Sequence, residues 1–143
     1  MLNEAQVEAN IPAGDIARAR AFYQDKLGFT PTMEMEGVWL RYETASGTAF
    51  NVYATQYAGQ AGHTIAQFHV TDVQDEVRAL KAKGVAFETY PDMPGVDWDG
   101  DVASMGSMGY AAWFKDSEGN ILCLDSGIPE QAASSGSTER PAS

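Results

Sequence analysis

The sequence lacks the features that mark several common classes of protein. Cys123 is the one cysteine among 143 residues, so the chain can form neither an internal disulfide nor a zinc site built from cysteine pairs. No apolar run approaches the roughly 18 residues that indicate a membrane span. The first ten residues, MLNEAQVEAN, lack the basic and apolar parts of a signal peptide. We therefore expect a cytoplasmic protein.

Basic residues are also scarce. The chain carries 9 Lys and Arg against 20 Asp and Glu, which gives a formal net charge of −11. Such a surface repels the phosphates of nucleic acids and of anionic membranes, so we expect neither as a partner. Solubility is a sufficient explanation of the charge, which identifies no ligand. What is present is 44% hydrophobic residues, enough for the core of one domain.

Two segments carry the signals of amphipathic helices. The first begins after Asp15, a good N-cap, and ends at Gly28; the second begins after Asp72 and ends at Gly84. Apolar residues recur at helical spacing along one face of each segment. Because the two segments are almost equal in length and have similar surroundings, the sequence predicts an internal repeat.

Strand-like stretches surround both helices. The first copy offers VEANI, TPTMEM, VWLRYET and TAFNVYA, with Ser46-Gly47 as a hairpin turn between the last two. The second copy offers IAQFHV, VAFETY, AAWFK and NILCLD. Each copy therefore has the order βαβββ, and the fold class is α+β.

The same patterns predict the limits of the domain. We expect one domain over residues 1–126, with modules at about 6–55 and 64–126. Residues 91–110 are rich in Gly and Met without a lasting periodicity, which favours a long, lid-like loop. Residues 127–143 are too polar and small to bury a core, which predicts a disordered tail.

Two segments resemble the vicinal oxygen chelate superfamily, which includes glyoxalase I, extradiol dioxygenases and the bleomycin and fosfomycin resistance proteins. They are DIARARAFYQDKLGF at 15–29 and WFKDSEGNIL at 113–122. The resemblance extends over about residues 6–126. It implies that the two βαβββ modules curve into an incomplete barrel around a small-molecule pocket. It also implies a homodimer, because family members of this length commonly pair two chains.

In that family a divalent metal is held by one residue from the first and one from the last strand of each module. The resemblance places these ligands at Glu8, Asn51, Ile65 and Cys123. An isoleucine has no lone pair to donate, and only Glu8 is an ordinary ligand for hard ions. We therefore expect no metal and no other cofactor. A shifted ligand set, such as Glu8 with Gln67 and His69, is the alternative.

Strand alternation offers a second prediction of which residues face the pocket, since residues i and i+2 share a face. Val7, Ala9 and Ile11 are expected to pack against helices, which leaves Glu8 and Asn10 opposite. The later strands contribute further side chains to this face, namely Asn51, Ile65, Gln67, His69, Ile121, Cys123 and Asp125. The polar side chains on this face either bind a ligand or hydrogen-bond one another.

The leading hypothesis is a metal-free protein that binds a small, partly apolar molecule in the cleft between the modules, as resistance proteins sequester drugs. The alternative is a glyoxalase-like lyase or isomerase, in which Glu8 and His69 form the pair suited to proton transfer. Cys123 is expected to be an inert thiol. The predicted ligand-binding residues are Asn10, Asn51, Tyr53, Gln67, Met105, Met108, Trp113 and Cys123.

Overall fold

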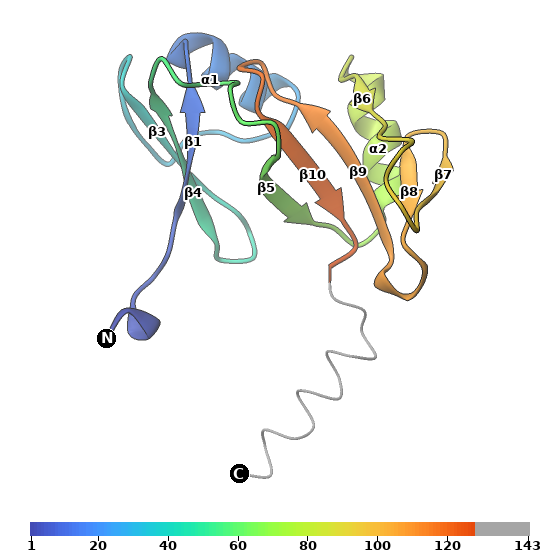
Figure 1. Ribbon diagram of the computed structural model, residues 1–143. Helices are drawn as coiled ribbons and strands as arrows, with labels where there is room; N and C mark the ends of the chain where they lie inside the picture. Colours follow the sequence, from blue (N-terminus) through green and yellow to red (C-terminus); the bar gives the residue numbers. More distant parts are fainter. Residues whose placement is uncertain (128–143) are drawn as a thin grey trace. The chain divides into compact units, whose positions relative to one another are not determined.

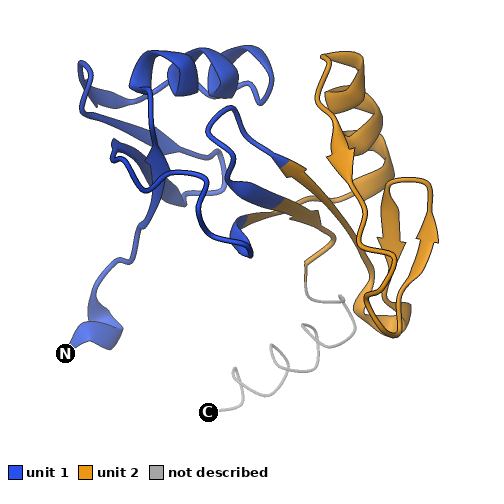
Figure 2. Ribbon diagram, turned by 45° about the horizontal axis from the view of Figure 1, so that its top comes forward, with its two compact units in different colours: residues 1–66, 115–122 blue, residues 67–114, 123–143 orange. Residues whose placement is uncertain are grey.

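The computed structural model describes residues 1–127. It divides into two compact units, one formed by Met1–Ala66 with Lys115–Leu122 and the other by Gln67–Phe114 with residues 123–127 (Figure 2). Apart from Gly127, the predicted tail lies outside the described residues. Within them, no helix has the length and apolar character needed to cross a membrane.

The first unit contains the first predicted βαβββ module. Its four strands form a sheet in the order β1-β4-β3-β2, in which β1 runs parallel to β4 and the other neighbours are antiparallel (Figure 1). The hairpin between β3 and β4 turns at Ser46-Gly47, where Gly47 has a φ of 94° that other residues rarely adopt. The elements are η1 (Leu2–Glu4), β1 (Ala9–Ala13), α1 (Ile16–Asp25), β2 (Met33–Met35), β3 (Trp39–Glu43) and β4 (Ala49–Ala54).

The second sheet follows the same plan with additional strands. Its order is β5-β10-β9-β8-β7, and β6 pairs with β9 beside this path. The elements are β5 (Thr64–His69), α2 (Val73–Ala82), β6 (Phe87–Glu88), β7 (Asp97–Asp99), β8 (Val102–Ser104), η2 (Gly106–Met108), β9 (Tyr110–Lys115) and β10 (Ile121–Asp125). The prediction of an α+β fold with two helix-and-sheet modules is confirmed.

Both helices begin at the predicted caps. The Asp15 carboxylate accepts a hydrogen bond from the Arg18 N–H at 3.0 Å, and the Asp72 carboxylate accepts one from the Asp75 N–H at 3.0 Å. Each bond satisfies a backbone donor that has no partner within the helix. The local sequence signals were therefore sufficient to place both helices.

The prediction that residues 91–110 form one long loop was wrong. It contains the β7–β8 hairpin, and β8 pairs with β9 at Ala103 and Ala111. The expected strand VAFETY is reduced to β6, which pairs with another part of β9 at Phe87 and Phe114. Sequence periodicity missed β8 because its buried part, Val102 and Ala103, is too short to show alternation.

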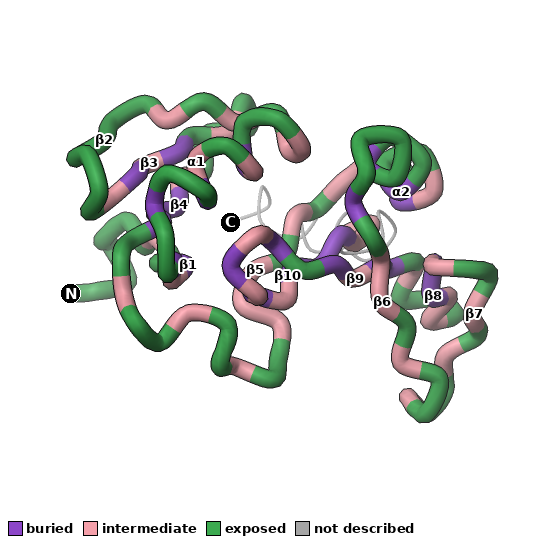
Figure 3. Tube along the Cα trace, turned by 90° about the horizontal axis from the view of Figure 1, so that it is seen from above, coloured by how far each residue is buried: buried purple, intermediate pink, exposed green. Residues whose placement is uncertain are grey.

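One face of the first sheet packs against α1. The helix buries Ile16, Ala19 and Tyr23, and the Tyr23 ring stacks on Tyr42 of β3 with centroids 5.6 Å apart. Alternate residues of β1 and β3 are buried, whereas β4 buries Phe50, Asn51 and Val52 in succession. Figure 3 shows buried segments in these strands in purple. The expectation that Val7 packs against helices was wrong, because β1 begins only at Ala9 and Val7 is 88% exposed.

A buried turn between β9 and β10 belongs to the first unit. The Asp116 carboxylate accepts hydrogen bonds from the Glu118 and Asn120 N–H groups, both at 2.9 Å, and from the Tyr23 hydroxyl at 2.7 Å. The Asn120 amide donates to the Pro12 carbonyl at 2.7 Å. Burial, together with the Asp116 charge, raises the pKa of Tyr23 well above its usual value. This turn, which is the DSEGN segment at 116–120, is thus hydrogen-bonded to both α1 and β1.

Glu118 of this turn binds the start of α1. Its carboxylate accepts the Gly14 and Asp15 N–H groups at 2.9 and 3.0 Å and forms two 2.9 Å bonds with the Arg18 guanidinium. A carboxylate at this end of a helix also interacts favourably with the helix dipole. Burial raises the pKa of Glu118, but the hydrogen bonds from Arg18, Ser117 and the Asp15 amide outweigh it, so the pKa is lowered.

We predict that Glu118→Gln lowers the free energy of unfolding by about 2–3 kcal/mol at pH 7, because the buried charge and its bonds to Arg18 are lost. The lowered pKa means that this contribution is present above the unfolded-state pKa and disappears as the pH falls through the folded-state pKa. The variant should therefore approach the parent in acid. Urea unfolding at several pH values measures the difference.

The matched control is Glu34→Gln, since Glu34 pairs with Arg20 at 2.8 Å on the surface. Exposed pairs contribute about 0–1 kcal/mol. Equal losses in the two variants would contradict a special role for Glu118.

Candidate functional site

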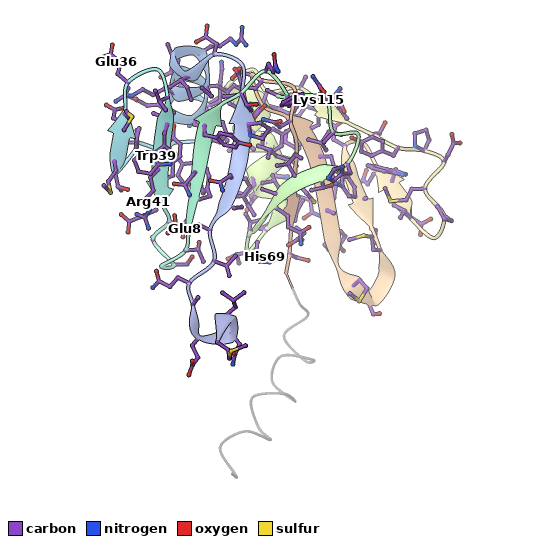
Figure 4. The ribbon with its side chains drawn as sticks, turned by 60° about the vertical axis from the view of Figure 1, so that its left-hand side comes forward. Glu8, Glu36, Trp39, Arg41, His69 and Lys115 are labelled. Carbon is purple, nitrogen blue, oxygen red and sulfur yellow. The ribbon has the colours of Figure 1, made fainter. Side chains whose placement is uncertain are left out.

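A polar network lies on the sheet face of the first unit opposite α1. Leu40 and Tyr42 of β3 are buried toward the helix, so Trp39 and Arg41 lie on the other face. Arg41 donates from Nε and Nη2 to the two oxygens of Glu8 at 3.1 and 3.0 Å. Figure 4 shows Glu8, Trp39 and Arg41 together on this sheet.

Asn51 of β4 completes the network. Its amide nitrogen donates to Glu8 Oε1 at 3.1 Å, and its oxygen accepts the Trp39 indole N–H at 2.9 Å. Arg41 also pairs through Nη1 with Glu43 at 3.3 Å. Two carboxylates therefore surround one guanidinium, so the centre of the face carries a formal charge of −1.

The hydrogen bonds fix the protonation states of the pair. The bonds from Arg41 lower the pKa of Glu8, burial opposes them, and the Asn51 bond lowers it further. The bond to Glu8 likewise raises the pKa of Arg41. Glu8 is thus a carboxylate held charged by a guanidinium, which makes it a weak proton acceptor near neutral pH.

The four positions of the superfamily's metal do not fit a divalent ion. Both Glu8 oxygens and both polar atoms of the Asn51 amide are already bonded, and Ile65 has no donor atom. Burial raises the pKa of the Cys123 thiol to about 12, so the thiol is protonated, and it donates to the Leu124 carbonyl at 3.4 Å. Within residues 1–127, no three side chains of His, Cys, Asp or Glu are grouped to hold a metal ion.

The second unit contains a histidine–carboxylate pair. His69, the last residue of β5, lies with Nδ1 2.5 Å from Oδ1 of Asp125, the last residue of β10. The same Asp125 oxygen accepts the Gly127 N–H at 2.9 Å. The His69 side chain is 63% exposed, whereas that of Asp125 is 17% exposed. The carboxylate orients the ring and leaves Nε2 as the nitrogen that a bound molecule can reach.

This pair forms part of a pocket of about 320 Å³. The volume lies at the small end of the range for ligand pockets. Four of the predicted site residues meet here, together with Asp125 and Gly127; they are Gln67, His69, Met105 and Met108. Because Glu8 belongs to the other unit, its predicted action with His69 on one ligand stays a prediction.

The remaining predicted residues lie in three settings. Asn10 is exposed on β1, opposite Asn51 in the register, and Tyr53 is 41% exposed opposite Trp39. Cys123 is buried, which agrees with an inert thiol. Trp113 is half-buried in an aromatic cluster, 5.9 Å from Trp98 and 5.6 Å from Tyr90 between ring centroids.

Arg41, the partner of Glu8, is not among the residues predicted from the sequence. The signal was present, because a charged residue two positions after Trp39 lies on the same strand face. Asp125 was placed on the pocket face, yet its pairing with His69 follows only from the neighbouring ends of β5 and β10. Alternation gives the face of a residue but not its neighbour on another strand.

We predict that Arg41→Gln raises the pKa of Glu8, because the charged hydrogen bonds are lost while partial burial remains. Titration of the Glu8 carboxyl carbon by NMR measures it. Glu43→Gln is the control, since it removes only the weaker partner of Arg41 and should leave Glu8 almost unchanged. An unaltered Glu8 titration in Arg41→Gln would contradict the ion pair.

Comparison with known proteins gives a family and a set of similar folds. Residues 5–124 match the model of the Glyoxalase/Bleomycin resistance protein/Dioxygenase superfamily. No curated protein matches the sequence significantly. Among solved structures, a lactoylglutathione lyase from Agrobacterium tumefaciens is 18% identical with a TM-score of 0.63, the match covering 87% of this chain and 94% of that one.

Two resistance proteins are similar to the same degree. A bleomycin resistance determinant encoded on the transposon Tn5 is 22% identical, with a TM-score of 0.63 and coverage of 84% of this chain and 95% of that one. The fosfomycin resistance protein FosX from Listeria monocytogenes, in complex with Mn(II), is 17% identical, with a TM-score of 0.63 and coverage of 90% and 94%. At these identities the likeness establishes the fold alone.

Proposed function

Because the chain belongs to the Glyoxalase/Bleomycin resistance protein/Dioxygenase superfamily, we propose that it binds a small, partly apolar molecule without the divalent metal of its metal-dependent relatives. One observation carries this proposal. The carboxylate of Glu8, the best hard-ion ligand of the expected four, is engaged by Arg41 and Asn51. A metal would have to displace a two-bond guanidinium pair in order to bind there.

The open face of the first sheet supports a partly apolar ligand. Strand register places Met33 opposite Arg41, and both Met35 and Tyr53 opposite Trp39. The two methionines are 57% and 58% exposed, and Tyr53 is 41% exposed. Aromatic and thioether groups thus surround a polar centre. This arrangement suits a ligand that has a flat or aliphatic part and a few hydrogen-bonding groups.

The charges of this face indicate which ligands it would accept. One guanidinium lies between the carboxylates of Glu8 and Glu43, so the centre carries no excess positive charge. An anionic ligand would meet this centre and a chain of net charge −11. We therefore expect a neutral or cationic molecule. Drug sequestration is the mode that this favours, and one structure of similar fold is a bleomycin-binding protein in complex with bleomycin.

We predict saturable binding of at least one member of a panel of neutral and cationic aromatic molecules, bleomycin included, when EDTA is present throughout. Trp39→Leu should weaken binding at least about tenfold, because an aromatic contact and its anchoring bond to Asn51 are lost. Calorimetric titration measures both. Glu36→Gln is the control, since Glu36 is exposed and outside the network. Binding that requires an added divalent metal would contradict the proposal.

The His69–Asp125 pair favours a second candidate, a lyase or isomerase that transfers a proton. Asp125 orients the ring, and Nε2 of His69 would act as the base. Glu8 is unsuited to that role because Arg41 holds its carboxylate in the charged form. Lactoylglutathione, from the name of the similar lyase, is the first substrate to test.

We predict that, if turnover of lactoylglutathione occurs with EDTA present, Asp125→Asn and His69→Ala each lower kcat by about tenfold or more. Steady-state kinetics measures the effect, and His63→Ala serves as the histidine control. Unchanged kcat in both pocket variants would exclude the pair as the proton acceptor.

A further inference from the structure

Two methionines of the second unit lie on one side of a short turn. Met105 precedes the 3₁₀-helix η2 and Met108 ends it, and the Met108 N–H donates to the Met105 carbonyl at 3.2 Å. Both side chains line the same pocket, the one that contains His69 and Asp125.

The turn is fixed against the end of β10. Tyr110 N–H donates to Ser126 Oγ at 3.1 Å, and Ser126 N–H donates back to the Tyr110 carbonyl at 3.2 Å. Gly109 has a φ of 91°, and a Cβ at this position would collide with Ser126 Oγ. Met105 N–H closes the turn by donating to the Gly109 carbonyl at 2.9 Å. The turn that carries both methionines is thus held beside Ser126, the residue that follows Asp125.

The imidazole is oriented as metal-binding histidines usually are. A ligating histidine typically bonds a carboxylate through its other ring nitrogen. Here Asp125 binds Nδ1 of His69, and its oxygen is itself bonded by the Gly127 N–H. Gly127 also lies against the side chain, where an added Cβ would be 3.7 Å from Cγ and Nδ1 of the imidazole. Nε2 is therefore the donor available to the pocket.

Two thioethers and one imidazole form a soft, uncharged donor set. Thioether sulfur favours Cu(I), whereas Mg²⁺, Ca²⁺ and Mn²⁺ favour oxygen donors. Asp125, the one carboxylate among the lining residues, already bonds His69 and Gly127. We propose that Met105, Met108 and His69 bind a soft monovalent metal ion of the Cu(I) and Ag(I) class. This donor set shares no residue with the four positions expected for the superfamily's divalent metal. It shares His69 and Asp125 with the second candidate function, but Ag⁺ binding is measured without a substrate.

The test is titration of the full chain with Ag⁺ in chloride-free buffer, followed by calorimetry. Cys123 is the competing soft group, so the parent chain is compared with Cys123→Ala. We expect one tightly bound Ag⁺ per chain in both proteins. Competition with a chromophoric Cu(I) chelator should give the same stoichiometry for Cu(I).

Variants of the pocket assign the site. Met105→Leu with Met108→Leu keeps the side-chain volume and should weaken Ag⁺ binding at least about tenfold. His69→Ala should do the same, and Asp125→Asn should weaken binding by about tenfold or more through loss of ring orientation. Urea unfolding checks that each variant is folded.

The matched control is Met33→Leu with Met35→Leu, because these methionines are exposed in the other unit. Ag⁺ binding should be unchanged in this variant. The proposal is overturned if Cys123→Ala binds no stoichiometric Ag⁺, or if the Met105 and Met108 variant binds as tightly as the parent. Equal losses in the two methionine pairs would also overturn it.

Discussion

The binding of the α1 N-terminus by a buried carboxylate is the interaction on which the first unit depends. Glu118 accepts two backbone N–H groups at the start of the helix and pairs with Arg18, while Asp116 of the same turn binds Tyr23 in the core. Residues more than ninety positions apart thereby fix the helix against its sheet. Glu8 and Arg41 lie on the opposite face of that sheet.

The two polar sites use their charges in different ways. In the first unit, Arg41 and Asn51 satisfy Glu8, which makes this carboxylate a poor base and supports the proposal that the centre recognises a neutral or cationic molecule. In the second unit, Asp125 binds one nitrogen of an exposed ring, and the other nitrogen of His69 is left for a ligand. In both units a carboxylate is paired with a nitrogen-bearing side chain. The pairing occupies Glu8 in the first unit, whereas in the second unit it orients the His69 ring.

The sequence predicted the elements whose signals are local. The caps Asp15 and Asp72 and the Ser46-Gly47 turn need only neighbouring residues, and all three are confirmed. Contacts that cross from one strand to another were not predicted. Arg41 meets Glu8 and His69 meets Asp125 through sheet pairing, which alternation along one strand cannot supply, and the hairpin β7–β8 was too short and too polar to show a period.

The central claim is that the Glu8–Arg41 pair replaces the divalent metal of this superfamily in the first unit. Mn²⁺ broadens the NMR signals of nuclei near its binding site, so side-chain spectra recorded during a Mn²⁺ titration test the claim most directly. The account predicts that Glu8 and Asn51 signals broaden no more than those of exposed carboxylates such as Glu36. Selective broadening of Glu8 and Asn51 at one equivalent of Mn²⁺ would contradict it.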